Sequence, residues 1–368
     1  MHAANSYANR LSRRESTDTP GLRGHADEIL DGFFSGAVSS FREAYVSITG
    51  DRRVTGRVED VNFDRLAVMT RFAEAVDTST FSDVLGQALN RALQAEYSRQ
   101  MANTLVWRKV AKVGRLNDFR THYSVRMGGY GALPAVTEGS AYQALSSPGD
   151  EAIGYAATKR GGTETITLEA IANDDVGLIR EIPKRLATAA ARTLGSFVLD
   201  FLRTNATIYD GVALFHATHG NLGSSALSAV SLYAAWLAMG KQAEYGSTER
   251  LHLRGKYLLV PYELEELANN LLVRDTNNDR FFIQNQGIEV VPVWDWTDAN
   301  DWVLAADPNA RHGIEVGFLD GREDPEFFIQ DVPSSGSIFS NDRITLKIRH
   351  IYGGAVTDFR PFYKGAVA

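Results

Sequence analysis

The chain has 368 residues, of which 44% are hydrophobic and 23% charged, as is typical of a globular protein with sizeable cores. It has no cysteine, which excludes disulfides, thiolate metal sites and a thiol nucleophile. Its net charge of -7 offers no overall attraction for nucleic acid. No apolar run approaches the roughly 18 to 20 residues that span a bilayer, so we expect synthesis in the cytoplasm without a signal peptide.

The N-terminal sequence predicts a polar arm followed by helices. Residues 1–24 are polar and are broken by "TDTPGLRG", which favours an extended arm. Residues 25–48 and 78–104 repeat apolar side chains every three or four positions, the pattern of amphipathic helices. Each of these helices has one face to bury.

A long hairpin is predicted next. Alternating arms at about 119–127 and 153–170 flank a stretch rich in glycine and proline. The arms are too polar to be buried on both faces, and so long a loop would be unusual inside one compact domain. We therefore expect the hairpin to reach onto a neighbouring copy of the chain. The candidate contact residues are Leu133, Pro134, Glu138, Gly139, Tyr142 and Lys159.

A long helix, which we call the spine helix, is predicted after the hairpin. Pro183 stands where a helix would begin, and only Gly195 interrupts the pattern before Asn205. Such a helix would be roughly 33 Å long. Its predicted packing residues are Leu194, Phe197 and Phe201, which we expect to face Ile344, Leu346, Ile348 and Ile351.

The rest of the sequence predicts a mixed α/β unit and two closing strands. Helical patterns cover 225–242 and 262–272, and strand patterns cover 256–261, 287–294, 301–307 and 313–319. We therefore expect residues 212–325 to form one α/β unit. The tail, 342–365, predicts two strands that form a hairpin around Gly353 and Gly354 and pack on the spine helix.

Five motifs occur in a suggestive order: "LPAVTEGSAY", "EAIANDD", "LFHATHGNLG", "YLLVPYELEELA" and "IRHIYGGAVTDFRPFYK". In that order they resemble the major capsid proteins of tailed bacteriophages with the HK97-type fold, over residues 100 to 364. Within that family the resemblance is greatest to the Mu-like major head subunit group. It implies an α+β fold, with an N-terminal arm and helical region (1–117), an extended β-hairpin or E-loop (118–172), a peripheral domain with the spine helix and closing strands (173–211 and 326–368) and an α/β axial domain (212–325).

The same resemblance implies a structural function. Copies of the chain would form hexamers and pentamers that close an icosahedral shell around phage double-stranded DNA, in the virion and after assembly in the host cytoplasm. The implied partners are further copies of the chain, the portal, scaffold or protease and decoration proteins, and packaged DNA without sequence preference. No membrane, cofactor or catalysis is implied. Some relatives crosslink a hairpin lysine to an asparagine of another subunit, but we interpret Lys159 as a plain solvent-facing lysine.

Two histidines raise a chemical alternative. His216 and His219 lie three residues apart and could share a zinc ion, but no other histidine completes a zinc spacing. We interpret them, with Asn221, as a turn that hydrogen-bonds backbone. The acid-rich stretch 275–286 lacks the glycine and glutamate of a calcium loop, and 294–302 favours a contact loop with aromatic anchors.

Two other classes of function are weighed against a shell subunit. A non-assembling soluble binding module would fit the composition but not an exposed hairpin. A His-dependent metalloenzyme would fit the histidine pair but not the missing partners, because nucleophile elbows, phosphate loops and the His-Glu-x-x-His pattern are absent from the sequence. The size of the purified particle separates a shell from either alternative.

Overall fold

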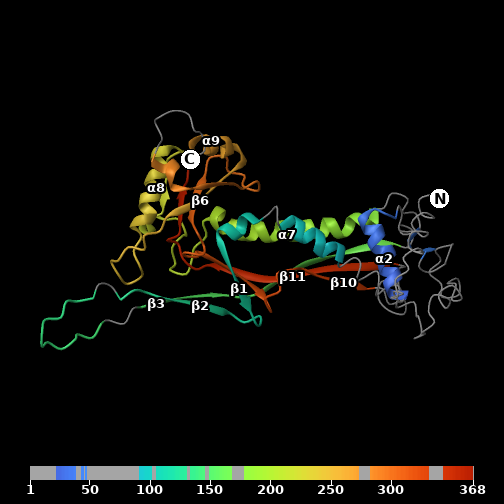
Figure 1. Cartoon of the computed structure of the whole chain (residues 1–368), viewed down its shortest axis with the longest axis horizontal. Coiled ribbons are helices and arrows are strands. Elements are labelled where there is room, and N and C mark those ends of the chain that lie inside the picture. Colours follow the sequence, from blue (N-terminus) through green and yellow to red (C-terminus); the bar gives the residue numbers. More distant parts are fainter. Residues whose placement is uncertain are drawn as a thin grey trace, which may run out of the picture. The chain divides into compact units, whose positions relative to one another are not determined.

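The computed structural model describes residues 22–38, 43–44, 46–47, 91–101, 105–130, 133–145, 149–167, 178–272, 282–330 and 343–367 (Figure 1). The chain divides into two compact units, one made of 1–102, 160–191 and 324–350, the other of 103–159, 192–323 and 351–368. Helix α7 (Leu178–Thr204) and strand β11 (Arg343–Val356) each contribute residues to both units. The mixture of helices and sheets confirms the α+β class.

The first unit contains two of the predicted amphipathic helices. Helix α2 (Leu22–Ser35) buries Leu30 and Phe33, and the helical residues 91–101 bury Leu93 and Tyr97. The prediction of one continuous helix over 25–48 is wrong at residues 36–38, which are not helical, although residues 43–44 and 46–47 are helical again. Gly36 has a φ of 89° and ends the helix, and the amide of Ala37 donates to the Gly32 carbonyl, which closes the last turn. The predicted arm before residue 22 lies outside the described residues.

The first unit also contains a pair of antiparallel strands. Strand β10 (Glu326–Gln330) pairs with the first half of β11, with Phe327 opposite Ile348. The ring of Tyr97 lies edge-on to that of His350, with centroids 6.0 Å apart. Strand β4 (Thr158–Thr167) also pairs with β11. In this unit α7 buries the small residues Ala187 and Ala191.

The second unit is built on a five-stranded sheet. Its order is β5 (Leu222–Gly223), β12 (Phe362–Gly365), β8 (Trp302–Ala306), β6 (Gly255–Val260) and β7 (Glu289–Pro292). Helix α8 (Ala229–Lys241) begins at a capping box between Ser228 and Ser231, and α9 (Glu265–Leu272) follows β6 after the short helix η4 (Tyr262–Leu264). The helices at 225–242 and 262–272 are thus confirmed.

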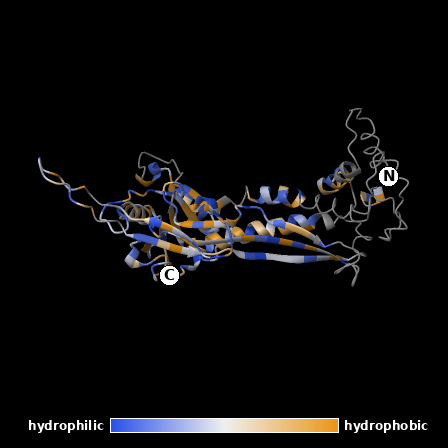
Figure 2. Ribbon diagram, turned by 90° about the horizontal axis from the view of Figure 1, so that it is seen from below, coloured by the Kyte–Doolittle hydropathy of each residue, from blue (hydrophilic) through white to orange (hydrophobic). Residues whose placement is uncertain are grey.

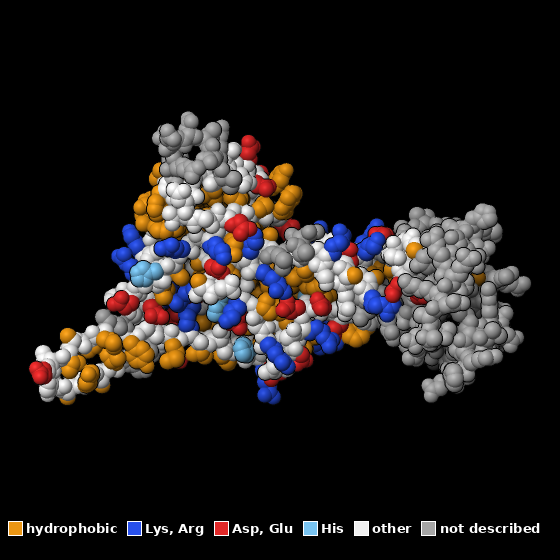
Figure 3. Space-filling model, viewed as in Figure 1, with side chains coloured by type: hydrophobic (Ala, Val, Ile, Leu, Met, Phe, Trp, Pro, Cys, Tyr) orange, Lys and Arg blue, Asp and Glu red, His pale blue; other side chains and the backbone are white. Residues whose placement is uncertain are grey.

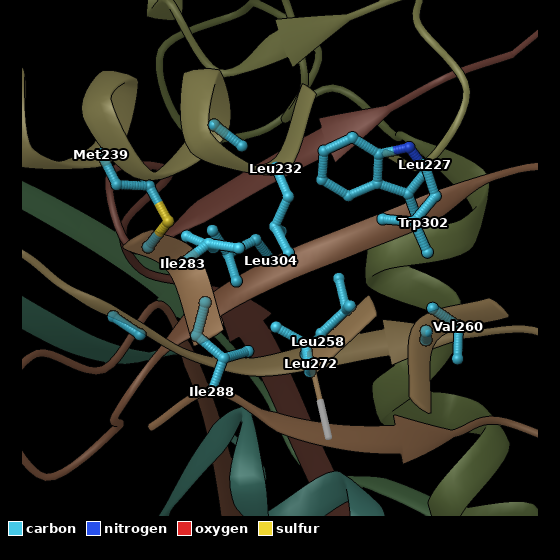
Figure 4. Packing of buried hydrophobic residues seen from close by; sticks show 13 residues of the cluster. Leu227, Leu232, Met239, Leu258, Val260, Leu272, Ile283, Ile288, Trp302 and Leu304 are labelled. Carbon is cyan, nitrogen blue, oxygen red and sulfur yellow. The ribbon is translucent and has the colours of Figure 1, made fainter. Parts of the chain in front are cut away.

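The core of this sheet lies against the two helices and the short helix η5 (Phe282–Gln286) (Figure 4). Every residue of strand β8 is buried, and this burial explains why the strand is apolar throughout. The indole nitrogen of Trp302 donates to the Ser225 carbonyl at 3.1 Å. The one polar group of this large buried side chain is therefore hydrogen-bonded. The labelled residues of the core are Leu227, Leu232, Met239, Leu258, Val260, Leu272, Ile283, Ile288, Trp302 and Leu304.

A second group of strands in this unit contains β9 (Ile314–Leu319). It pairs in parallel with β1 (Ala111–Leu116) and antiparallel with the second half of β11. The short helix η2 (Leu105–Lys109) leads into β1 and buries Trp107. The prediction that 212–325 forms one α/β unit is therefore wrong in detail, because β9 leaves that sheet and β12, from the C-terminus, completes it.

The predicted turn at Gly353 and Gly354 is also wrong. Strand β11 runs straight through both glycines, and β12 belongs to another sheet. The glycines instead permit close approach. A Cβ atom at Gly353 would overlap the Ala156 carbonyl oxygen, and one at Gly354 would lie 2.7 Å from the Glu315 carbonyl oxygen.

The spine helix begins earlier than predicted. Helix α7 starts at Leu178, five residues before Pro183, which lies inside it. Because proline has no amide hydrogen, Pro183 removes one backbone hydrogen bond near the start of the helix without ending it.

Replacing Gly353 by alanine tests its role in close approach. We expect Gly353→Ala to lower the free energy of unfolding by about 1 to 3 kcal/mol, the usual cost of forcing a methyl group into a packed site. Urea denaturation measures the change. Gly162→Ala is the matched control, since a Cβ atom there meets nothing within 4 Å. An equal loss of stability in the two variants would contradict the role assigned to Gly353.

Candidate functional site

The candidate site is a hairpin formed by β2 (His122–Met127) and β3 (Asp150–Tyr155), which pair antiparallel with His122 opposite Tyr155. The pairing continues for one further bond, from the Gly128 amide to the Gly149 carbonyl at 2.9 Å. The predicted second arm, 153–170, is wrong in its extent. It ends at Tyr155, and the following β4 pairs with β11 instead.

The hairpin exposes apolar side chains along its length. Residues at alternate positions of β2 place Tyr123, Val125 and Met127 on the outside, each more than half exposed. Beyond the strands Leu133 is 77% exposed and Tyr142 is 88% exposed. Figure 2 shows hydrophobic and hydrophilic residues interspersed along this segment, and Figure 3 shows hydrophobic side chains following it. Contiguous exposed apolar surface of this kind marks an interaction site.

The other hairpin residues named from the sequence are exposed as well. Pro134, Glu138 and Gly139 all lie in the exposed stretch 133–140. Gly139 has a φ of 78°, and the amide of Ser140 donates to the Thr137 carbonyl. Residues 137–140 therefore form a tight turn. Lys159 is also exposed, but it lies in β4 and its ammonium is 5.0 Å from the ring centroid of Phe119.

The first anchor of the hairpin is the carboxylate of Glu315 on β9. The hydroxyl of Ser124 donates to one oxygen at 2.9 Å, and the hydroxyl of Tyr155 donates to the other at 2.8 Å. Each strand of the hairpin is therefore held by the same side chain. Burial and the neighbouring Glu315 carboxylate raise the pKa of Tyr155 well above its ordinary value, so its hydroxyl remains a donor.

The second anchor is the fully buried carboxylate of Asp358. Arg126 of β2 approaches it at 2.6 Å, Arg311 at 2.5 Å and Arg360 at 3.0 Å. Glu151 of β3 binds Arg126 at 2.7 Å and Arg360 at 3.3 Å. Both strands of the hairpin thus end in one cluster of ion pairs with the corner that precedes β12.

The electrostatics of this cluster favour the charged form of Arg360. Although burial opposes the charged form, the Asp358 and Glu151 carboxylates raise the pKa of Arg360 above its ordinary value. Tyr209 donates to Glu151 at 3.3 Å and accepts from Arg126 at 3.2 Å. Burial and the Asp358 carboxylate raise the pKa of Tyr209 to about 12, so it stays neutral at physiological pH.

The third anchor is a close backbone contact. A Cβ atom at Gly149 would lie 2.9 Å from the Tyr245 ring, and one at Gly128 would overlap the Tyr245 carbonyl oxygen. Gly129 is equally close to the Glu244 side chain. Three glycines of the predicted glycine-rich stretch therefore let the base of the hairpin rest on this turn. Beyond them every described residue up to Leu145 is exposed.

The histidine pair lies in a turn near Asp358. His216 caps the short helix η3 (Ala217–His219) through its ring nitrogen Nδ1, which accepts from the Thr218 amide at 3.2 Å. His219 is buried, lies 2.8 Å from Asp210 and stacks on Phe359 with ring centroids 3.9 Å apart. Among the described residues, no group of three histidine, aspartate or glutamate side chains is placed to hold a metal ion.

The buried amide of Asn221 completes this turn. Its oxygen accepts from the His216 amide at 3.1 Å, and its nitrogen donates to the Leu214 carbonyl at 2.8 Å. Gly220, with a φ of 62°, supplies the left-handed conformation that the turn needs. The three residues named from the sequence as a structural turn are brought together here.

The predicted packing residues of the spine helix occupy one side of α7. Leu194 is fully buried, whereas Phe197 and Phe201 are partly buried and lie edge-on at 5.1 Å between ring centroids. Phe197 also meets the ring of Tyr352 at 5.3 Å. The expected contacts with residues 344–351 stay a prediction.

The comparisons with known proteins point to one family. A family model described as phage capsid protein matches residues 150–365, more than half of the chain. No curated protein matches the chain in sequence. Among the described helices, none combines the length and the hydrophobicity that a membrane-spanning segment requires.

Solved structures are similar to the chain at low sequence identity. One from Microbacterium phage Oxtober96 has a TM-score of 0.50 and 14% identity, and the match covers 71% of this chain and 90% of that chain. One from Mycobacterium phage Bobi has a TM-score of 0.48 and 12% identity, covering 72% and 90%. A third, described as the capsid of an empty GTA particle, has a TM-score of 0.46 and 14% identity, covering 72% and 90%.

The substitution Asp358→Asn tests the anchor. Removing one partner of a buried ion pair costs about 3 to 5 kcal/mol, because the remaining charges stay buried without compensation. We expect a loss of this size in urea denaturation, together with faster proteolytic cleavage within the hairpin.

The matched control is Asp200→Asn, in the exposed pair that Asp200 forms with Arg203 at 2.8 Å. An exposed pair contributes less than about 1 kcal/mol, so this variant should resemble the wild type. Equal stability of the two variants would show that Asp358 does not anchor the hairpin.

Proposed function

Because the chain belongs to the phage capsid protein family, with the HK97-type fold, we propose that it is the major head subunit of a tailed phage. In this proposal its copies form hexamers and pentamers and close an icosahedral shell around packaged double-stranded DNA. The observation that supports this best is the anchored hairpin with its exposed apolar side chains.

The hairpin supports the proposal because its two parts have opposite character. Its base is held by Glu315, Asp358 and the turn at Tyr245, whereas Leu133 and Tyr142 beyond it are exposed. Covering apolar surface contributes about 25 cal/mol for each Å² removed from water. A segment that carries such surface away from its own core gains this energy only when another molecule covers it. In a capsid the available molecule is another copy.

The proposal gives the chain no reaction to catalyse. The function of the family is structural, and the histidine pair takes part in a turn. We further propose that the chain resides in the virion after assembly in the host cytoplasm, and that the portal, scaffold or protease and decoration proteins contact the assembled shell. Membership of the Mu-like group stays a prediction.

Shortening the hairpin tests the proposal. Residues 130–148 would be replaced by Asn-Gly, a turn that joins two antiparallel strands and leaves β2, β3 and all three anchors intact. We expect a folded, soluble chain, lighter than the 40.4 kDa of the full-length chain, that forms no closed shells in electron microscopy, whereas the wild type forms them.

Two outcomes would count against this function. Normal shells from the shortened chain would show that the hairpin is dispensable for assembly. Wild-type protein that stays at the mass of one chain under all assembly conditions would contradict the shell itself and favour a soluble binding module.

A further inference from the structure

Two loops that are far apart in the sequence meet at one end of the five-stranded sheet. Strands β6 and β7 are parallel, with Leu258 opposite Val290. Because parallel strands run in the same direction, the segments that follow them, 261–266 and 293–301, lie at the same end of the sheet. Loops at the carboxyl ends of parallel strands are a frequent place for binding sites, since the strands hold them rigidly.

This end of the sheet carries an aromatic pair that remains exposed. Tyr262 is 58% exposed, Trp294 is 72% exposed, and their ring centroids lie 5.0 Å apart. Large aromatic side chains gain free energy when they leave water, and in protein interfaces they are among the residues that most often anchor a partner. The pair therefore offers a surface to another molecule.

The loop that carries Trp294 is fixed on both sides of this residue. Val293 is buried, and its amide donates to the Val260 carbonyl at 2.8 Å. Trp296 is buried as well, and its amide donates to the Val293 carbonyl at 3.4 Å. A partner would thus meet a preformed surface and lose little entropy in ordering it.

Four exposed carboxylates belong to the same two segments. They are Glu263, Glu266, Asp295 and Asp298. In the part of the chain that the structure describes, none of the four forms an ion pair, and neither segment contains lysine or arginine. We call these four acids, together with Tyr262 and Trp294, the acidic aromatic patch. Figure 3 shows acidic and hydrophobic side chains side by side on this unit.

We propose that the acidic aromatic patch binds a basic segment of another protein, in which arginine and lysine side chains lie close together. Both components of the patch fit such a segment. The carboxylates pair with its positive charges, and the ring faces of Tyr262 and Trp294 attract the same cations. Arginine fits best, because its planar guanidinium group binds carboxylates through two hydrogen bonds and also stacks on aromatic rings.

A basic partner is favoured over a second copy of the chain and over a purely apolar partner. The chain carries a net charge of -7, so two copies repel each other at long range. An apolar partner would remove water from the four carboxylates without pairing them, which is unfavourable. The inference goes beyond the proposed function and does not depend on it, because the whole patch belongs to one chain.

A peptide of alternating arginine and glycine, labelled with fluorescein, is the probe that tests the proposal. Fluorescence anisotropy measures its binding to the purified chain before assembly. We expect saturable binding that weakens as salt is added, because salt screens exposed charges. The same peptide with serine in place of arginine should not bind. Equal binding of the two peptides, or no binding of either, would overturn the proposal.

A pair of charge variants locates the binding. The variant Glu263→Gln with Glu266→Gln should bind the arginine peptide about two- to tenfold more weakly, the range expected when two exposed ion pairs are lost. The matched control is Glu138→Gln with Glu249→Gln, which removes two exposed carboxylates elsewhere and leaves the same net charge. It should bind as the wild type does. Equal weakening in both variants would show attraction by net charge alone and overturn the patch.

The variant Trp294→Ala tests the aromatic component. We expect binding about two- to fivefold weaker, the effect of losing a cation–π contact at an exposed site. The control Tyr142→Ala removes another exposed ring, from the hairpin, and should leave binding unchanged. A folded Trp294→Ala chain, checked by circular dichroism, that binds as tightly as the wild type would contradict the role of the rings. The comparison of peptides on the wild type holds whether or not a variant folds.

Assembled shells separate a basic partner from a second copy as the occupant of the patch. We expect shells to bind the arginine peptide as the unassembled chain does. Binding that disappears on assembly would show that another copy covers the patch, and it would overturn this proposal while the shell function stands. Failure of the chain to form shells would instead contradict the shell function, and peptide binding by the free chain would still decide this inference.

Discussion

The interaction on which the rest of the structure depends is the burial of the Asp358 carboxylate among three guanidinium groups. A buried charge is tolerated only when partners surround it. Here Arg360 lies two residues from Asp358, whereas Arg126 and Arg311 come from distant segments of the chain. Asp358 precedes β12, the strand that completes the five-stranded sheet. One carboxylate therefore joins the base of the hairpin to the start of the sheet's last strand.

The direction of the hairpin follows from this constraint. Two strands alone are marginally stable in water, so a hairpin that leaves its core needs support at its base. Glu315 accepts one hydrogen bond from each strand, the Asp358 cluster forms ion pairs with both strands, and Gly149 lets the chain lie against Tyr245. The apolar side chains beyond the base are then presented outward before any partner arrives, which reduces the entropy lost on binding.

Much of the fold could be predicted from local patterns, but the long-range pairings could not. The apolar runs of β6 and β8 and the helical repeat of α7 are local signals. The pair Gly353 and Gly354 suggested a turn, because a sequence shows glycine but not the backbone that approaches it. Likewise, nothing local links Arg126 to Asp358, since ordinary surface arginines and aspartates have the same spacing. The exposed hairpin residues were predictable because their polar flanks and glycines excluded a buried position.

The central claim is that another copy of the chain covers the exposed side chains of the anchored hairpin. The most direct measurement is a cryo-electron microscopy reconstruction of particles assembled from the purified chain. We predict closed shells in which Leu133 and Tyr142 of each copy lie against another copy, while Arg126 keeps its contact with Asp358 of its own chain. Shells in which both apolar side chains remain exposed to solvent, or in which the hairpin folds back on its own chain, would contradict the account.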